Sequence, residues 1–252
     1  MNANPEGLRK TYIFHILIIS TLAIGLYLNT LKNGFVYDDG GTIVNNTSIK
    51  SLDNLPLLFD KAAYFSRSGE MSYRPVVTFT YFIDYAFYGL KPWGYHLTNI
   101  LLHAINGALL YFFLTLLLTP RFSLFVFSIS ILFVTHPVLT EAVNCISYRE
   151  DLLAFLFYMT TLSLYLILRA ELTTGHRPLY AALLYLLSCL TYLLALLSKE
   201  MAVTLPLIVF CYEWLYGKEK TKLPFNRYII GYLVITFFYL YLRFYLFHNP
   251  KE

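Results

Sequence analysis

The 252-residue chain is 58% hydrophobic and only 13% charged, whereas a typical soluble domain is about 45–50% apolar and about 25% charged. A soluble chain of this length could not bury so much apolar surface, so we expect lipid to be its solvent. The formal net charge is only +4, and no block of basic residues of the kind that binds nucleic acids is present.

Three cysteines, Cys145, Cys189 and Cys211, lack the CxxC spacing of a metal knuckle and do not form the dense pattern of a disulfide framework. The first apolar run is too long for the core of a signal peptide, and no small-residue cleavage pattern follows it. We therefore expect this run to be retained as a membrane anchor.

Seven apolar runs predict an all-α polytopic membrane protein with about seven transmembrane helices. A spanning helix needs about 17–25 residues, so the shortest run must thin the bilayer locally or end in a cavity lined by protein. The runs cover residues 12–31, 96–118, 122–135, 152–168, 179–197, 201–216 and 228–247.

One further apolar stretch, residues 76–90, carries Asp84 and lies between Pro75 and Gly89. If it does not cross the membrane, the basic residues near the other helix ends all share one side with the N-terminus, as the positive-inside rule requires. We therefore expect this stretch to lie flat or re-entrant within an outer loop of residues 32–95, with a cytoplasmic N-terminus. The basic residues concerned are Arg9, Lys10, Arg121, Arg169, Arg177, Lys218, Lys220, Lys222 and Arg227.

In this topology every candidate chemical group lies on the non-cytoplasmic side. Asp38 and Asp39 come just after the first span. Paired carboxylates can divide their work, because one can accept a proton while the other binds a cation. The alternative is a polar turn, since Asp-Gly is ordinary loop chemistry.

A second group of polar residues occupies the segment 136–151, between two predicted spans. Polar groups this close to the membrane core are costly unless they are paired, and they are often functional. The alternative is an ordinary connection in which Arg149 pairs with Glu141 or Glu150. The candidate residues are His136, Glu141, Glu150 and Asp151.

Four polar residues, His96, Asn99, His103 and Asn106, share one face of the second predicted span. Such a stripe faces protein or water rather than lipid. Hydrogen bonds between helices would account for the last three residues. His96 is expected at the outer mouth, where it could contact substrate.

Two basic residues on the outer side are candidate phosphate ligands. Arg74 offers the bidentate geometry that suits a phosphate, although it could also be an interfacial arginine that snorkels. Lys199 lies in a tight corner between two spans, where it could instead pair with Glu200. Arg243 lies near the end of a predicted helix, where we expect it to snorkel, although on the outer side it could also reach a phosphate.

Six short blocks of residues stand out along the chain. They are FVYDD at 35–39, YRP at 73–75, GYHLTN with LLH within 94–103, HPVLTEAV at 136–143, REDLL at 149–153 and LSKE at 197–200. With these blocks in this order, the sequence resembles the membrane half of the transmembrane and tetratricopeptide-repeat O-mannosyltransferases and their bacterial relatives. This family belongs to the GT-C glycosyltransferases.

The resemblance implies a glycosyltransferase that uses a lipid-phosphate-linked sugar. Asp38 would orient or deprotonate the acceptor hydroxyl, and Asp39 would be its partner toward metal or acceptor. Glu141 would lie in the second outer loop, where relatives carry further acidic or metal-linked residues. The candidates for binding the donor and its phosphate are Arg74, Arg149, Lys199 and His96.

No cofactor is required by the sequence, which carries no nucleotide or dinucleotide motif. A divalent cation, Mg²⁺ or Mn²⁺, is an option, with Asp39 and Glu141 as its candidate ligands. Arg and Lys side chains could take its place.

Two features depart from the family pattern. Family members continue into a variable membrane module and usually into repeats, so we expect residues 1–252 to form the shared membrane module without those parts. The block at 149–151 reads Arg-Glu-Asp, where a small residue is expected between Arg and Asp. This leaves the role of Glu150 open.

The expected function is transfer of a sugar, with mannose as the candidate, from a polyprenyl- or dolichyl-phosphate donor to a protein or glycan hydroxyl. The active side would be periplasmic in a bacterial inner membrane or lumenal in the endoplasmic reticulum. One alternative is a truncated, non-catalytic scaffold that binds lipid-linked sugar. Another is a transporter, which predicts ionisable groups at mid-membrane and paired broken helices; here the charges gather at one face.

Overall fold

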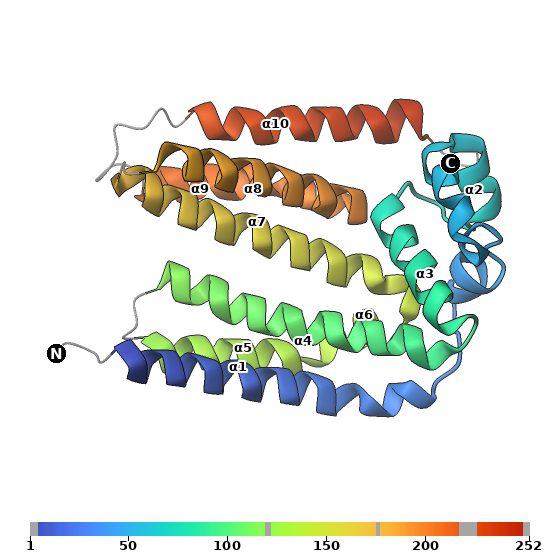
Figure 1. Cartoon of the computed structure of the whole chain (residues 1–252), viewed down its shortest axis with the longest axis horizontal. Coiled ribbons are helices and arrows are strands. Elements are labelled where there is room, and N and C mark those ends of the chain that lie inside the picture. Colours follow the sequence, from blue (N-terminus) through green and yellow to red (C-terminus); the bar gives the residue numbers. More distant parts are fainter. Residues whose placement is uncertain (1–4, 119–121, 175–176, 217–225, 249–252) are drawn as a thin grey trace.

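Long helices run back and forth along one axis and form a bundle (Figure 1). The structure is a computed structural model that describes residues 5–118, 122–174, 177–216 and 226–248. Within these residues every regular element is a helix, which confirms the predicted all-α class. The helices that run along the bundle are α1 (Pro5–Tyr27), α4 (Pro92–Leu117), α5 (Ser123–Thr135), α7 (Arg149–Thr174), α8 (Pro178–Ser198), α9 (Leu205–Tyr216) and α10 (Asn226–Tyr241).

Other helices connect these elements at one end of the bundle. They are α2 (Lys61–Arg67), α3 (Pro75–Tyr88) and α6 (Thr140–Asn144). Proline sets several helix starts, because its fixed φ suits the first helical turn, where no backbone N–H is needed. Pro75, Pro92 and Pro178 each occupy the first turn of a helix in this way.

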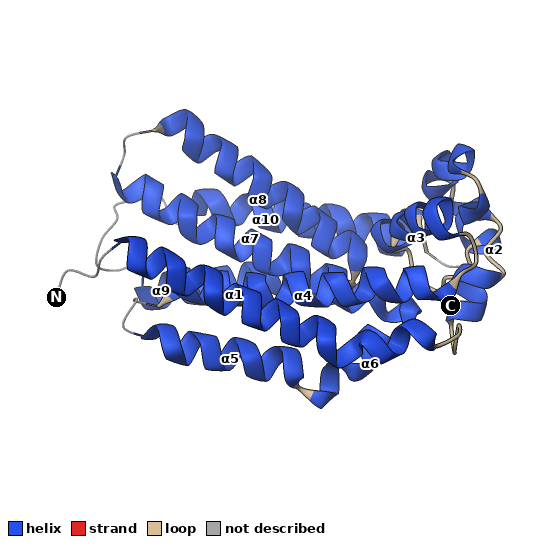
Figure 2. Cartoon of the chain, turned by 60° about the horizontal axis from the view of Figure 1, so that its bottom comes forward, coloured by secondary structure: helices blue, strands red, loops and turns tan. Residues whose placement is uncertain are grey.

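The described residues contain five helices that are long and apolar enough to cross a membrane. A sixth span results if α5 and the following segment, Pro137–Asn144, are taken as one span with a 45° bend (Figure 2). The chain is therefore an integral, multi-pass membrane protein. The five helical spans are Arg9–Lys32, Pro92–Leu117, Ile146–Thr173, Pro178–Ser198 and Tyr228–Leu246.

All seven predicted runs form helices, but the run at 201–216 differs from the expected span. Its first residues belong to a 3₁₀ segment, Glu200–Thr204, and α9 has only 12 residues. At 1.5 Å per residue α9 is about 18 Å long, which is short of the roughly 30 Å hydrocarbon core. The described part of the chain thus gives five to six spans rather than seven.

Helix α3 lies across one end of the bundle, where it packs against α4, α7 and α8 (Figure 1). It has 14 residues and is not among the candidate spans, as expected for the stretch 76–90. The N-terminal end of α1, the C-terminal end of α7 and the start of α8 lie at the opposite end of the bundle. Arg121, Lys218, Lys220 and Lys222, which entered the topology argument, lie outside the described residues.

The long loop after α1 is folded onto the bundle end rather than extended from it. Its side chains form a buried cluster with α3 and α4 that includes Ile43, Tyr64, Tyr81 and Tyr95. Within the loop, Gly69 has a positive φ of 66°, and a Cβ atom there would lie 2.6 Å from the carbonyl oxygen of Gly41. The close backbone contact fixes the segment before α3 against the segment that follows Asp38 and Asp39.

Candidate functional site

The predicted site residues gather at the end of the bundle that α3 covers. We call this end the polar end and define it as residues 32–91, 136–151 and 199–204. It contains nine of the predicted site residues, and these come from three segments far apart in the sequence; one of the nine, Arg149, is described separately below. The other eight are Asp38, Asp39, Arg74, His136, Glu141, Glu150, Asp151 and Lys199.

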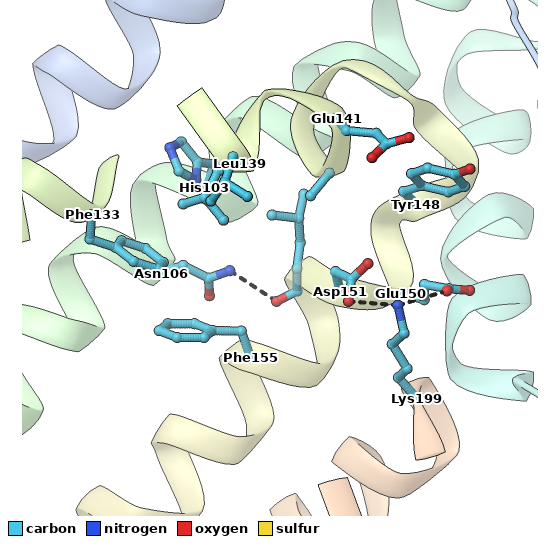
Figure 3. Close-up of a pocket in the computed structure, with 13 residues that line it drawn as sticks. His103, Asn106, Phe133, Leu139, Glu141, Tyr148, Glu150, Asp151, Phe155 and Lys199 are labelled. Carbon is cyan, nitrogen blue, oxygen red and sulfur yellow. Dashed lines mark hydrogen bonds and ion pairs between the residues drawn. The ribbon is translucent and has the colours of Figure 1, made fainter. Parts of the chain in front are cut away.

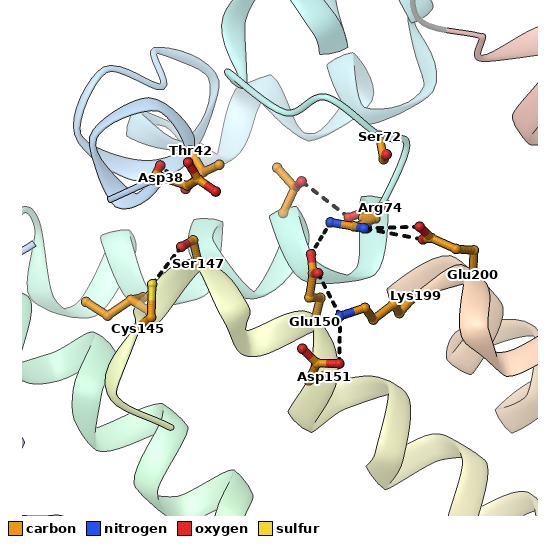
Figure 4. A network of polar contacts seen from close by, with 12 residues as sticks. Asp38, Thr42, Ser72, Arg74, Cys145, Ser147, Glu150, Asp151, Lys199 and Glu200 are labelled. Atoms are coloured by element: carbon orange, nitrogen blue, oxygen red, sulfur yellow. Dashed lines mark hydrogen bonds and ion pairs between the residues drawn. The ribbon is translucent and has the colours of Figure 1, made fainter. Parts of the chain in front are cut away.

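The two adjacent aspartates have different environments. Asp39 is fully buried, and its carboxylate accepts hydrogen bonds from the backbone N–H of Ser147 at 2.7 Å and of Val36 at 2.9 Å. Asp38 (Figure 4) is exposed and lines a cavity of about 280 Å³, which we call the Asp38 cavity. Asp39 therefore ties the loop to the segment before α7, while the Asp38 carboxylate faces the cavity.

The residue before this doublet has an unusual backbone conformation. Tyr37 has φ of 48°, and among the described residues it is the only non-glycine residue with positive φ. A bulky residue in this region is strained, and such strain is concentrated at functional sites. The Tyr37 ring is 86% exposed, so side-chain burial does not account for the conformation.

Two more cavities adjoin the Asp38 cavity. The Asn106 cavity, of about 530 Å³, shares Tyr148 and Glu150 with it. A third cavity of about 840 Å³, the Asn144 cavity, shares Tyr37 with the Asp38 cavity and Glu141 with the Asn106 cavity. Asp38 and Glu141 thus lie at one end of the bundle, in neighbouring cavities around Tyr148 rather than in a single pocket.

Arg74 and Lys199 belong to a network of ion pairs between these cavities (Figure 4). The guanidinium of Arg74 pairs with Glu150 and lies 3.3 Å from a carboxylate oxygen of Glu200. The ammonium of Lys199 lies 3.1 Å from the other Glu150 oxygen and 2.7 Å from Asp151. Glu150, whose role the sequence left open, is thus held between two cations.

The network is nearly balanced in charge. Arg243 extends it through a 3.5 Å contact with Glu200. Three cations (Arg74, Lys199 and Arg243) then face three carboxylates (Glu150, Asp151 and Glu200). Burial lowers the pKa of Lys199, but its hydrogen bond to Asp151 and the charge of Glu150 outweigh burial and raise this pKa above its ordinary value. Lys199 therefore stays charged.

Glu70 is a site residue that the sequence reasoning missed. It is only 9% exposed and lines the Asp38 cavity. Burial raises the pKa of the Glu70 carboxyl to about 8; Arg74 opposes the shift, while Glu150 and Asp38 add to it. A single acidic residue in a loop is expected to be exposed to solvent. The only sequence signal that could have marked Glu70 as a site residue is its position four residues before Arg74.

Arg149 is enclosed in the protein rather than open to a cavity. It is fully buried and pairs with Asp84 of α3 at 2.6 Å, not with Glu141 or Glu150. Its guanidinium also donates hydrogen bonds to Asn99 at 2.7 Å and to the Tyr95 carbonyl at 3.1 Å. These contacts join α3 to α4 and α7, and they occupy the donors that a lipid phosphate would need.

The polar stripe of α4 makes hydrogen bonds to neighbouring segments. Asn99 donates to the carbonyl oxygens of Val143 and Cys145 at 3.3 Å. His103 and Asn106 contact backbone carbonyls of α5 and α7. His96 is fully buried and lines none of these three cavities; its contact with substrate stays a prediction.

A metal ligand set is not preformed at this site. In the described ranges, no three His, Cys, Asp or Glu side chains are close enough to hold a metal ion. Both carboxylate oxygens of Asp39 already accept hydrogen bonds, and His136 caps the turn 137–139 by accepting from the Val138 N–H. Glu141 is exposed and lines two cavities, so it remains open to a ligand.

Comparison with known proteins agrees with the sequence blocks. The chain is 37% identical over 163 residues to a protein O-mannosyl-transferase of Caenorhabditis elegans, and this alignment covers 62% of this chain and 24% of the relative. It is 36% identical over 154 residues to human protein O-mannosyl-transferase TMTC2 (60% and 18%). It is 33% identical over 212 residues to Drosophila melanogaster protein O-mannosyl-transferase Tmtc2 (81% and 22%).

No family model matches the chain, and no solved structure gives a significant match. The aligned segment makes up between 16% and 24% of the length of the curated relatives. The predicted resemblance is confirmed over this segment: the chain is a homologue of part of the TMTC family of protein O-mannosyl-transferases.

Proposed function

We propose that this chain carries the catalytic site of a mannosyltransferase that takes its sugar from a polyprenyl- or dolichyl-phosphate donor. The acceptor is a hydroxyl group of a protein or glycan on the periplasmic or lumenal side of the membrane. The similarity to proteins named O-mannosyl-transferases supports the reaction class. The observation that carries the proposal is the exposed Asp38 carboxylate in a cavity at the polar end, fixed by its buried neighbour Asp39.

Asp38 is the group placed to activate an acceptor. Its carboxylate takes the proton of the acceptor hydroxyl while the hydroxyl oxygen attacks the anomeric carbon of the sugar. A new carbon–oxygen bond forms on the face opposite the departing phosphate, so the anomeric configuration inverts. The electron pair of the broken bond goes to the lipid phosphate, which leaves as an anion.

Arg74 and Lys199 are the cations placed to stabilise that anion. Each contacts a different oxygen of Glu150, at the boundary between the Asp38 and Asn106 cavities. Because these cations are already paired, an incoming phosphate displaces Glu150 from at least one of them or arrives with a divalent cation. Glu70 carries its proton at neutral pH, so it does not oppose the phosphate.

The paired state of both cations also favours a second function. A chain whose Arg74 and Lys199 stay bound to Glu150 would hold the lipid-linked sugar by other contacts and would not stabilise a leaving phosphate. It would then act as a non-catalytic scaffold.

Measuring the transfer of sugar from radiolabelled donors distinguishes the mannosyltransferase from the non-catalytic scaffold. Membranes that contain the chain, and matched membranes without it, receive labelled mannosyl lipid phosphate, glucosyl lipid phosphate or GDP-mannose, each with and without EDTA. We expect label to enter protein or glycan from the mannosyl lipid phosphate only. Donor that binds to the chain without transfer of label contradicts catalysis and supports the scaffold.

A further inference from the structure

Two residues that line the Asn106 cavity carry buried polar atoms that the mechanism above does not use. The cavity lies between α4, α5, α6 and α7 at the polar end (Figure 3). His103 is fully buried and Asn106 is 1% exposed, and both line the cavity. Within the part of the chain that the structure describes, His103 Nδ1 and Asn106 Oδ1 have no hydrogen-bond partner.

The partners of these two side chains determine what the free atoms can do. His103 Nε2 lies 3.1 Å from the Val134 carbonyl oxygen, which can only accept, so Nε2 carries the proton and Nδ1 of the neutral ring is an acceptor. The Asn106 amide nitrogen donates to the Leu152 carbonyl at 2.9 Å, which leaves its oxygen as an acceptor. The cavity thus offers two buried acceptors from successive turns of α4.

Unsatisfied buried acceptors are costly and call for a donor. An isoprenyl chain has no donor, and a phosphate oxygen is itself an acceptor, so neither satisfies these atoms. A hydroxyl group does, because it donates one hydrogen bond. The chemistry of the cavity therefore favours a ligand with several hydroxyl groups.

The walls and the rim of the cavity fit the same kind of ligand. Phe133 and Phe155 stack with their ring centroids 4.9 Å apart and line the cavity beside Asn106 (Figure 3). Aromatic rings form flat apolar surfaces against which the C–H face of a sugar ring packs. Glu141 and Asp151, which are exposed acceptors, stand at the rim.

We infer that the Asn106 cavity binds the hexose ring of the donor, with Asn106 and His103 accepting hydrogen bonds from two of its hydroxyl groups. This inference rests on the proposed function and names the sugar-binding part of that site. The cavity meets the Asp38 cavity at Tyr148 and Glu150. A sugar held there presents its anomeric carbon toward Asp38 and its phosphate toward Arg74 and Lys199.

Equilibrium binding of two lipids to the purified full chain tests the subsite. The probes are the methyl ester of a short-chain isoprenyl phosphate and the same lipid phosphate carrying mannose in place of the methyl group, so that both are phosphodiesters, and the readout is the ratio of their Kd values. Because this ratio isolates the contribution of the sugar, we expect wild-type protein to bind the mannosylated lipid at least about tenfold more tightly. Loss of one neutral hydrogen bond lowers affinity about fivefold, so Asn106→Leu is expected to reduce the ratio by about that factor.

A second variant fills the cavity without removing a hydrogen bond. Leu139 lines the cavity, and Leu139→Trp is expected to bring the ratio close to one while the sugar-free lipid still binds. The matched control is Leu132→Trp, which adds the same side chain at a position on α5 that is 63% exposed. This control is expected to keep the wild-type ratio.

The possible results separate the inference from the proposed function. A wild-type ratio retained in both Asn106→Leu and Leu139→Trp overturns the sugar subsite and leaves the lipid-phosphate donor standing. A wild-type ratio of one, with both lipids bound, overturns the subsite in the same way. If wild-type protein binds neither lipid, the proposed function fails and the subsite fails with it.

Discussion

At the scale of single residues, Asp38 and Asp39 have the same chemistry and opposite surroundings. The Asp39 carboxylate accepts hydrogen bonds from two backbone N–H groups, whereas Asp38 lines the Asp38 cavity. A charged carboxylate accepts hydrogen bonds at both oxygens, whereas an asparagine amide accepts at only one. The same substitution should therefore have different effects at the two positions.

We predict that Asp39→Asn lowers the free energy of unfolding by about 1–3 kcal/mol, because the amide leaves one buried N–H, of Ser147 or Val36, without an acceptor. Thermal unfolding of the detergent-solubilised protein measures the loss, and Asp38→Asn is the matched control, expected to unfold like wild type. Equal unfolding temperatures for Asp39→Asn and Asp38→Asn would contradict the assigned role of Asp39.

Glu70 should make stability depend on pH. Its pKa is about 8 in the folded protein and ordinarily 4.5, so between these values the unfolded chain releases a proton that the folded chain retains. This group therefore stabilises the fold fully below pH 4.5, and its contribution is lost as pH rises toward 8, by at most about 1.4 kcal/mol per pH unit.

The variant Glu70→Gln cannot titrate, and we predict that it gains stability relative to wild type as pH rises from 5 to 8, with no further gain above pH 8. Unfolding midpoints of the two proteins between pH 5 and 9 provide the measurement. A difference between them that stays constant over this range would show that Glu70 is not held protonated.

At the scale of elements, α3 shows how one buried charge pair attaches a helix to the end of the bundle. Its sequence is apolar enough to resemble a span, yet it carries Asp84, which pairs with the fully buried Arg149 of α7. Together with Asn99 and Tyr95 of α4, the pair attaches α3 to the bundle end. Removing one partner of such a pair leaves an uncompensated buried charge.

We predict that Asp84→Asn destabilises the protein by about 3–5 kcal/mol, because the Arg149 charge is left unpaired in the interior. Asp53→Asn, at an exposed carboxylate, should change stability by less than about 0.5 kcal/mol. Denaturation of the two variants under the same detergent conditions gives the comparison. Similar losses for both would mean that the Arg149–Asp84 pair does not hold α3 in place.

The close backbone contact between Gly69 and Gly41 also shapes the polar end, because it holds Glu70 near Asp38. Alanine at Gly69 would combine a φ of 66° with a Cβ atom 2.6 Å from a backbone oxygen. We predict that Gly69→Ala loosens the loop, seen as faster proteolysis between α1 and α3. Gly34→Ala, where a Cβ atom meets nothing within 4 Å, should be cleaved at the wild-type rate; faster cleavage there as well would contradict this account.

At the scale of the whole molecule, the sequence predicted where the chemical groups gather but not which of them are open to ligands. Alternation of helix direction places Asp38, Arg74, Glu141 and Lys199 at one end, and the runs of apolar residues suffice for that inference. The burial of Arg149 and the occupation of Asp39 depend on contacts between residues that lie 50 to 108 positions apart in the sequence. One sequence without its fold carries no signal for such contacts.

The central claim is that Asp38 acts on the acceptor hydroxyl from the polar end of this membrane bundle. Its most direct test is the rate of transfer of labelled mannose from mannosyl lipid phosphate in membranes that contain equal amounts of wild-type or Asp38→Asn chain. The account predicts that Asp38→Asn inserts and unfolds like wild type but loses transfer by at least about a hundredfold, the scale of a missing general base. Transfer by Asp38→Asn at the wild-type rate would contradict it.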